Sequence, residues 1–393
     1  MKFQISTYFK NDKSNYLWLL FGLLACILAA RNYLLPAKEF MTHYNNYLIF
    51  KQSFFHLLEG KNLYAPYPEE HYDFFKYAPA FSLFFGLFAW LPDWLGLALW
   101  NLTNVGVLVL AIKKLPNLSN NHKLIFGILV LQEAITTTMN SQSNALIAGL
   151  LILSWIALEK GKFTKAGLFI ALTAFIKIFG ILFLFLFLFY PKWYKSVLPV
   201  AGIFVLLFLL PITILGYQGL LDSYQSFGNL LAADHGNFVK YSVMGWLQNW
   251  FGIVPAKNTV VLLGFVLQFI PAPIWILKTR NADSRFRFMA LLAASLLIWM
   301  VIFNHMAESA TYIIAVMGVM MWFFYSGWDK KWRIILLIPV MAFTCFGPSD
   351  IYPPELRENI VVHWQLKVFP CILIWFICLV QMGQIALAKR ITE

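Results

Sequence analysis

The sequence contains few charged residues and few cysteines. Only 12% of its 393 residues are charged, whereas 60% are hydrophobic and the mean hydropathy is +0.69. About 25% of the residues of a soluble globular domain are charged, so this composition excludes an ordinary soluble protein. The four cysteines lie in or beside apolar runs, and their spacing indicates neither a disulfide framework nor a zinc site. Because a Walker loop and a glycine-rich dinucleotide fingerprint are also absent, we expect no nucleotide, metal or other cofactor.

Long apolar runs are abundant, and runs of about 18 or more residues are typical of membrane-spanning helices. The sequence predicts spans near 16–35, 95–112, 123–138, 143–159, 195–215, 258–277, 287–303, 309–326, 332–347 and 366–387. Residues 164–190 are interrupted by Lys177 and Gly180, which favours two short helices that meet at a tip. We therefore predict an all-α polytopic membrane protein with about 12 transmembrane helices. No segment outside the spans is long enough for a soluble domain, so residues 1–393 are expected to form a single integral membrane domain.

Basic residues are concentrated on one side of the predicted spans. The loops on that side hold 20 Lys or Arg and 5 acidic residues, and the opposite loops hold 7 basic and 12 acidic residues. Lys and Arg are enriched on the cytoplasmic side of membrane proteins. We therefore predict a multi-pass protein of the plasma (inner) membrane with both termini in the cytoplasm. The net charge of +12 then reports topology, and since no basic soluble face exists, nucleic acid is not an expected partner.

An amphipathic pattern follows the first predicted span. Apolar residues recur at three- and four-residue intervals from Tyr47 to Leu58, and a glycine, Gly60, follows them. The polar residues that alternate with or follow these positions are Lys51, Gln52, His56 and Glu59. This periodicity predicts a helix that ends near Gly60 and lies along the outer membrane surface.

Residues 74–91 are apolar but are bounded by Pro79 and Pro92. The uninterrupted stretch is too short to cross a bilayer, and counting it as a span would place the basic loops outside. We expect an interfacial or re-entrant helix on the outer side.

The outer loops hold the titratable side chains that an active site would use. Glu39, Asp73 and Lys76 lie in the long loop after the first span, and His305 and Glu308 lie in a later loop. A spacing of three predicts that His305 and Glu308 share one helical face, where the acid would tune the imidazole towards proton transfer. The alternative interpretation is that these are ordinary polar residues of the membrane interface.

Two polar features interrupt the apolar spans. Residues 136–144 (TTTMNSQSN) form a dense run of hydrogen-bonding groups that includes Gln142 and Asn144, and an ordinary turn with helix capping is the alternative. Lys177 has apolar residues on both sides. An intramembrane Lys is costly and is often functional, which suggests a partner such as a lipid-linked phosphate; snorkelling to the interface is the alternative.

The order of these features resembles glycosyltransferase family 87, the C-type membrane glycosyltransferases that use polyprenyl-phosphate sugars and include mannosyltransferases. The matching motifs are, in order, residues 57–64 (LLEGKNLY), 75–79 (FKYAP), 99–101 (LWN), 141–144 (SQSN), 166–167 (AG) and Lys177. The resemblance covers most of the chain.

The resemblance implies a hexosyltransferase with the C-type architecture. Its donor would be a polyprenyl-phosphate sugar and its acceptor a glycan or glycolipid, with membrane lipids around it. It also implies that Lys177, Gln142, Asn144, Lys76 and Tyr64 bind substrate. The leaving group would be a lipid phosphate, which a cation such as Lys177 would stabilise.

One departure concerns the base. The family commonly places an Asp at the start of the surface helix, and this chain has Asn46 there. An amide does not accept a proton at neutral pH, so Asn46 is expected to position substrate. We nominate His305 as the base with Glu308 as its orienting partner, and Glu39 and Asp73 as second choices. A single displacement would invert the anomeric centre.

Other classes of function remain open. A glycan polymerase, a ligase or a catalytically silent membrane protein would share the outer polar loops and would suit Asn46. A secondary transporter would also be polytopic with a buried Lys, but such folds show broken helices in corresponding positions of two halves. The second half shows no counterpart of residues 164–190.

Overall fold

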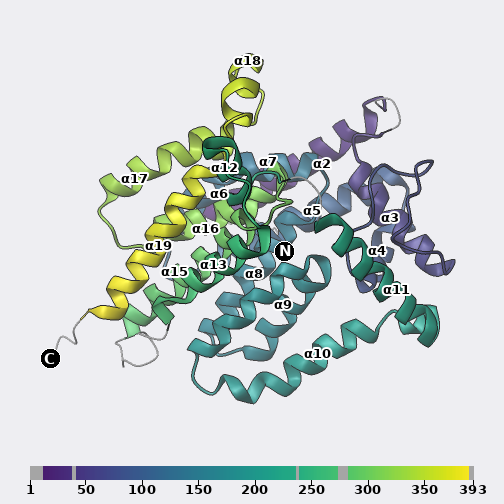
Figure 1. Ribbon diagram of the computed structural model, residues 1–393, viewed down its shortest axis with the longest axis horizontal. Helices are drawn as coiled ribbons and strands as arrows, with labels where there is room; N and C mark the ends of the chain where they lie inside the picture. Colours follow the sequence, from purple (N-terminus) through teal and green to yellow (C-terminus); the bar gives the residue numbers. More distant parts are fainter. Residues whose placement is uncertain (1–11, 38–40, 236–238, 273–281, 389–393) are drawn as a thin grey trace, which may run out of the picture. The chain divides into compact units, whose positions relative to one another are not determined.

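The computed structural model describes residues 12–37, 41–235, 239–272 and 282–388 (Figure 1). Throughout these residues the regular structure is helical, with no β-strand among them. The chain divides into two compact units: unit 1 comprises residues 1–124 and 134–237, and unit 2 comprises residues 125–133 and 238–393. The predicted all-α class is therefore confirmed, and a single domain over residues 1–393 stays a prediction.

Unit 1 is built around α8, which is buried along most of its length and packs against both α5 and α9. A helix that is apolar all round is typical of such a central position. α2 packs against α5, and α3 packs against α4. The helices of unit 1 are η1 (Lys13–Asn15), α2 (Tyr16–Leu34), α3 (Asn45–Leu58), α4 (Pro79–Ala89), α5 (Asp93–Lys114), α8 (Asn144–Glu159), α9 (Phe163–Ile176), η2 (Ile178–Phe189), η3 (Trp193–Ser196), α10 (Val197–Leu209) and α11 (Ile212–His235). Two further helices, α6 (Asn120–Leu129) and α7 (Leu131–Met139), each contribute residues to both units.

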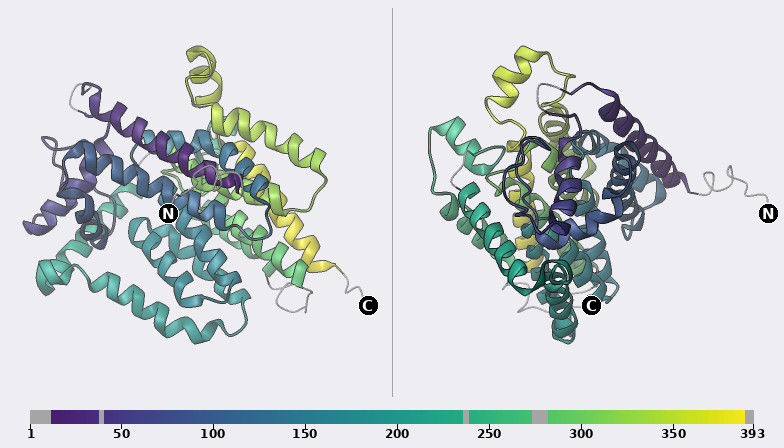
Figure 2. Two further views of the ribbon diagram at one scale, coloured as in Figure 1. Left: turned by 180° about the vertical axis from the view of Figure 1, so that it is seen from behind. Right: turned by 90° about the vertical axis from the view of Figure 1, so that its right-hand side faces the viewer.

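Unit 2 has α15 at its centre, and the C-terminal helix α19 packs along it (Figures 1 and 2). α16 packs against both of these helices. The helices of unit 2 are α12 (Val243–Phe251), α13 (Lys257–Phe269), α15 (Ala282–Ile302), η4 (Ser309–Thr311), α16 (Tyr312–Tyr325), α17 (Lys330–Pro339), η5 (Val340–Phe346), α18 (Pro354–Leu356), η6 (Arg357–Val362) and α19 (Phe369–Leu387). η5 and η6 are π-helical.

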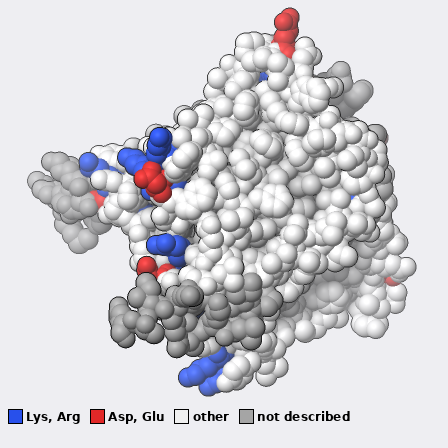
Figure 3. Space-filling model, turned by 60° about the vertical axis from the view of Figure 1, so that its left-hand side comes forward, with Lys and Arg blue, Asp and Glu red and all other residues white. Residues whose placement is uncertain are grey.

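Four helices in the described residues are long and apolar enough to cross a membrane by themselves: 13–34, 93–114, 283–302 and 369–387. A bent pair, 193–209 with 212–233, raises the number to five if it counts as one span. The predicted twelve passes are not shown, because most of the other apolar runs form helices of 10–17 residues. A full crossing needs about 20 helical residues. The face drawn in Figure 3 supports a membrane environment, since most of its described surface is uncharged and the charges gather at its edges.

Two predicted segments have a different structure. The predicted span 123–138 is interrupted at Val130, between α6 and α7. The predicted span 195–215 ends early, because the chain bends by 85° at the break that contains Pro211. α11 then continues through the region predicted to be an outer loop, with a kink at Gly216 where φ is 67°.

Candidate functional site

The predicted surface helix is α3, and one of its faces is buried. Phe50 is 1% exposed, and its ring lies edge-on to those of Phe81, Phe85 and Trp100 at centroid distances of 5.2 to 5.7 Å. This aromatic cluster fixes α3 against α4 and α5. α4 begins at Pro79, where a proline is well tolerated in a helix, and its 11 residues make it the short helix predicted between the two prolines.

α3 ends at Leu58, two residues before Gly60, and so ends near Gly60 as predicted. The Gly60 backbone is left-handed, with φ of 66°, and two hydrogen bonds close the helix end, Lys61 N to His56 O and Gly60 N to Leu57 O. A glycine is favoured here because a Cβ is strained in this conformation. Beyond it, Tyr64 is buried, and its hydroxyl donates to Tyr77 O at 2.9 Å.

His56 was predicted to lie among the polar positions of this helix, and that prediction is wrong. The His56 side chain is 3% exposed, and its Nε2 lies 2.8 Å from a carboxylate oxygen of Glu70. Its ring lies against that of Tyr67 at a centroid distance of 3.9 Å. Glu70 offers the imidazole a charged partner, which makes burial tolerable. Conversely, Leu58 was predicted to be on the apolar face and is 42% exposed.

Three consecutive carbonyl groups of the turn after α7 accept hydrogen bonds from side chains of three helices. Asn32 of α2 donates to Met139 O at 2.7 Å, Asn46 of α3 to Asn140 O at 2.8 Å, and Trp100 of α5 to Ser141 O at 2.8 Å. Ser141 is left-handed, with φ of 51°. Side chains of three different helices bind these carbonyl groups, so the turn is held in one conformation. The contact at Asn46 needs an N–H donor, which an aspartate lacks.

This turn leads directly to two polar residues, Gln142 and Asn144, that connect it to Lys177. Gln142 Oε1 accepts from Asn144 Nδ2 at 2.5 Å, and Asn144 Oδ1 accepts from Lys177 Nζ at 2.8 Å. Three of the five residues that were predicted to bind substrate therefore form one connected polar chain within unit 1. The Asn144 amide is neutral, so this contact orients the ammonium without cancelling its charge.

Lys177 lies where α9 ends and η2 begins, in extended backbone (φ −135°, ψ 121°). The predicted arrangement of two short helices that meet at Lys177 is confirmed. Gly180 permits the close approach, because a Cβ there would lie 2.4 Å from Thr173 Oγ1. A methyl group at that distance from a packed side chain would force the two helices apart. Lys177 is half-buried.

An apolar groove of about 340 Å³ begins one turn after Lys177 and lies between η2 and α10. It is lined by Ile181, Leu184, Phe187, Trp193, Ser196, Val197, Val200, Ala201 and Phe204. Eight of these nine side chains are apolar, so the groove suits a hydrocarbon chain.

The loop between α3 and α4 carries Asp73, Lys76 and His71. Asp73 is left-handed, with φ of 76°, and its half-exposed carboxylate lies 3.3 Å from Lys76 Nζ. His71 is buried, and loss of solvation lowers the pKa of its imidazole. His71 is therefore neutral near pH 7. Glu39, the other acid nominated in this region, lies outside the described residues.

The expected helical face of His305 and Glu308 is absent, because residues 303–308 form a turn between α15 and η4. Short-range spacing misled the prediction here: a separation of three aligns side chains only in a helix. The Glu308 carboxylate accepts from Lys240 Nζ at 2.8 Å, and His305 O accepts from Lys240 N at 2.8 Å. Both residues belong to unit 2, whereas Asn46, Asp73 and Lys177 belong to unit 1.

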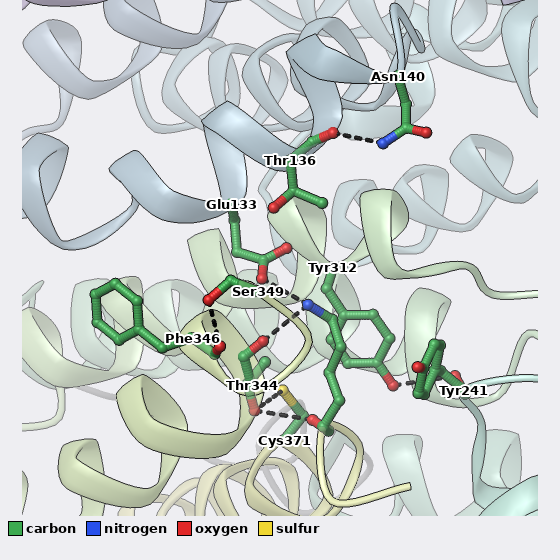
Figure 4. A network of polar contacts seen from close by, with 10 residues as sticks. Glu133, Thr136, Asn140, Tyr241, Tyr312, Thr344, Phe346, Ser349 and Cys371 are labelled. Carbon is green, nitrogen blue, oxygen red and sulfur yellow. Dashed lines mark hydrogen bonds and ion pairs between the residues drawn. The ribbon is translucent and has the colours of Figure 1, made fainter. Parts of the chain in front are cut away.

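Unit 2 contains a fully buried ion pair that was not predicted from the sequence (Figure 4). Lys367 Nζ lies 2.6 Å from Glu133 Oε1 and 2.8 Å from Thr344 O, and both charged side chains are 0% exposed. The ammonium also lies 4.9 Å from the ring centroid of Tyr312, whose hydroxyl donates to Tyr241 O. The signal was present, since Lys367 lies in a predicted span, but Glu133 was assigned to an outer loop.

The described residues contain no group of three or more His, Cys, Asp or Glu side chains that could hold a metal ion. Their cysteines are free, and Cys345, Cys371 and Cys378 are buried.

No curated protein matches the chain. A family model, that of glycosyltransferase family 87, matches residues 74–322. The matched range begins before α4 and ends within α16; it includes Lys177 and His305, and it does not include Asn46. The match covers more than half of the sequence; it includes all the motifs named above except residues 57–64, which lie before it. The chain therefore belongs to glycosyltransferase family 87.

Proposed function

We propose that this membrane glycosyltransferase transfers a hexose, such as mannose, from a polyprenyl-phosphate sugar to a glycan or glycolipid on the outer side of the membrane. Family membership supports a transferase activity. The identities of the donor, the sugar and the acceptor are what we propose. The observation that carries it is Lys177, whose ammonium is held by Asn144 and which precedes, by four residues, the first lining residue of an apolar groove, Ile181.

This arrangement suits a ligand with one anionic group and a long hydrocarbon chain. The Lys177 ammonium would bind the phosphate, and the turn of residues 139–144 would keep Asn144 and Gln142 in place because its carbonyl groups are fixed from three helices. The lipid chain would follow the groove between η2 and α10. As the glycosidic bond breaks, negative charge develops on the phosphate, and a fixed cation stabilises that charge.

The acceptor hydroxyl needs a base within hydrogen-bond reach. His305 remains the first candidate, without the helical pairing with Glu308 that the sequence predicted, and Asp73 and Glu39 are the second choices. Lys76 would assist substrate binding next to Asp73, and Tyr64 would shape the same loop. In a single displacement the base takes the hydroxyl proton, the acceptor oxygen bonds to the anomeric carbon, and the lipid phosphate leaves with the bonding electrons. The anomeric configuration is inverted.

The test is a transfer assay with purified protein in detergent or vesicles. We expect transfer from a lipid-phosphate hexose and none from a nucleotide sugar, with an inverted linkage in the product. A panel of His305→Ala, Asp73→Asn and Glu39→Gln, each checked for folding, identifies the base. Loss of the true base lowers kcat by about 10²- to 10⁴-fold. Uptake of sugar without transfer would favour a transporter instead.

A catalytically silent protein is a second candidate, favoured by the contact of Asn46. Its amide donates to Asn140 O, so the residue at the family's usual base position supports the turn. Asn46→Asp separates the two cases. In an active enzyme this change disturbs the turn and lowers transfer, whereas in a silent protein it would create transfer that the native chain lacks.

The side of the membrane is tested by cysteine labelling in a Cys26→Ser background, since Cys26 is the exposed native cysteine. Gln225 of α11 and Asn120 of α6 are both exposed and lie in regions predicted on opposite sides. Gln225→Cys should react with an impermeant maleimide in intact cells, and Asn120→Cys should react only after permeabilisation. The reverse pattern would overturn the predicted orientation.

A further inference from the structure

We propose that a cavity of about 210 Å³ between the end of α3 and α11 is a binding site for a single neutral sugar ring. The inference rests on the proposed function and adds a second site to it. This cavity shares no lining residue with the apolar groove near Lys177. The cavity is lined by Gly60, Lys61, Asn62, Leu215, Gly219, Asp222, Ser223 and Ser226.

Two local structures shape this cavity. On one side, the left-handed Gly60 turns the chain sharply after α3, so that the Lys61 and Asn62 side chains line the cavity. On the other side, α11 presents residues spaced three and four apart, which share one face of a helix. Gln218 donates to Asp222 Oδ1 at 2.9 Å and thereby orients the carboxylate. Both sides belong to unit 1.

The side chains favour a polyol over an anion. The Asp222 carboxylate accepts hydrogen bonds from sugar hydroxyls but repels a phosphate. The single cation, Lys61, lies 2.6 Å from Glu59, so its charge is already balanced by a carboxylate. Ser223, Ser226 and Asn62 add groups that both donate and accept, which match hydroxyl groups of either orientation.

The size also selects the ligand. Ligand sites of about 300–1,000 Å³ hold drug-sized molecules, so the smaller cavity here fits one ring and excludes a folded oligosaccharide. The ring belongs either to the acceptor or to the hexose of the donor. Both are neutral rings with several hydroxyl groups, so the KM values for donor and acceptor are needed to tell them apart.

The first experiment measures binding without transfer. Saturation-transfer NMR with free monosaccharides is recorded on the full-length wild-type protein, Ser226→Leu and Gln225→Leu. Ser226→Leu fills the cavity, and Gln225→Leu places the same side chain at an exposed neighbouring position outside the lining. We expect binding to wild type and to Gln225→Leu, and its loss in Ser226→Leu. Equal signals from all three proteins would overturn the site.

The second experiment measures KM for each substrate in Asp222→Asn, with Gln225→Leu as control. Loss of a charge-assisted hydrogen bond raises KM by about 10-fold or more. A rise confined to the acceptor assigns the site to the acceptor, and a rise confined to the donor assigns it to the donor sugar. Unchanged values for both substrates would overturn the site. If no transfer occurs at all, the proposed function fails, and the NMR experiment still decides whether the cavity binds sugar.

Discussion

Two lysines in apolar surroundings, Lys177 in unit 1 and Lys367 in unit 2, are held in contrasting ways. Lys367 is 0% exposed and is paired with the Glu133 carboxylate at 2.6 Å. Lys177 is half-buried, and its Nζ donates to the neutral Asn144 amide at 2.8 Å. A carboxylate cancels the charge of an ammonium, whereas an amide only orients it.

We propose that Lys367 serves structure and that Lys177 serves function. Removing two charges from water is costly, and a buried pair persists when each charge compensates the other. Lys367 also contacts Thr344 O and the Tyr312 ring, so its surroundings use the ammonium for packing and hydrogen bonding. The lining of the apolar groove begins at Ile181, four residues after Lys177, and the phosphate of a bound lipid would be a further partner of this ammonium. The variants below test this division of roles.

The largest effect is expected from breaking the buried pair. Lys367→Met leaves Glu133 buried without its partner, and we expect the free energy of unfolding to fall by about 3–5 kcal/mol. Adding Glu133→Gln to this variant removes the remaining charge and should recover most of the loss. Unfolding in SDS titrations measures both effects.

Asp283→Asn, at an ion pair whose aspartate side chain is 89% exposed, is the control and should change stability by less than about 1 kcal/mol. A stable Lys367→Met protein that no longer transfers sugar would move Lys367 from a structural to a functional role.

The next effect concerns donor use. Lys177→Ala should raise donor KM or lower kcat/KM by about 10- to 150-fold, because a charge-assisted hydrogen bond to phosphate is lost. Lys177→Arg should retain part of this activity, since its planar fork carries the charge but places it differently. The matched control is Lys165→Ala at an exposed position of α9. Wild-type donor kinetics in Lys177→Ala would show that Lys177 only packs.

A smaller change converts one lysine site into the other. Asn144→Asp places a carboxylate beside Lys177, as Glu133 lies beside Lys367. We expect an intact fold and a donor KM raised by about 10-fold, because the new charge competes with the phosphate for the ammonium. The control is Asn140→Asp, which adds the same charge at an exposed position of the turn. An Asn144→Asp enzyme with unchanged donor KM would contradict the role of the neutral contact.

The smallest effect follows from His71, where burial again opposes a charge. Its pKa is lowered, so the unfolded chain, with a His pKa of about 6.5, binds the proton more readily than the folded protein. The stability contributed by neutral His71 is therefore complete above pH 6.5 and is lost as the pH falls towards the lowered pKa. Thermal unfolding between pH 7.5 and pH 5 should show this decline, and His71→Phe should flatten it. The exposed His122, changed to Phe, should leave the decline as in wild type.

Local pattern was enough to predict α3 and the junction at Lys177. The apolar periodicity from Tyr47, the stop at Gly60 and the interruption of residues 164–190 each depend on neighbours within a few residues. Composition was likewise enough to predict a helical membrane protein. Helix lengths were harder to predict, because α6, α7, α10 and η5 end within apolar runs that look continuous in sequence.

Long-range partners were inaccessible from the sequence. Glu133 and Lys367 are 234 residues apart, and Asn32 lies 107 residues from the carbonyl group that it binds. Asn46 could be identified as a departure from the family, but its contact with Asn140 depends on how α3 packs. The placement of His305 and Glu308 failed for the opposite reason, since a local spacing was read as helical where the chain forms a turn.

The most direct test of the account compares two lipids that differ only in charge. Native mass spectrometry would measure binding of a polyprenyl phosphate and of the corresponding polyprenol to wild type, Lys177→Ala and Lys165→Ala. We expect wild type and Lys165→Ala to prefer the phosphate by about 10-fold or more, and we expect Lys177→Ala to lose this preference while still binding polyprenol. A Lys177→Ala protein that keeps the wild-type preference for the phosphate would contradict the central claim.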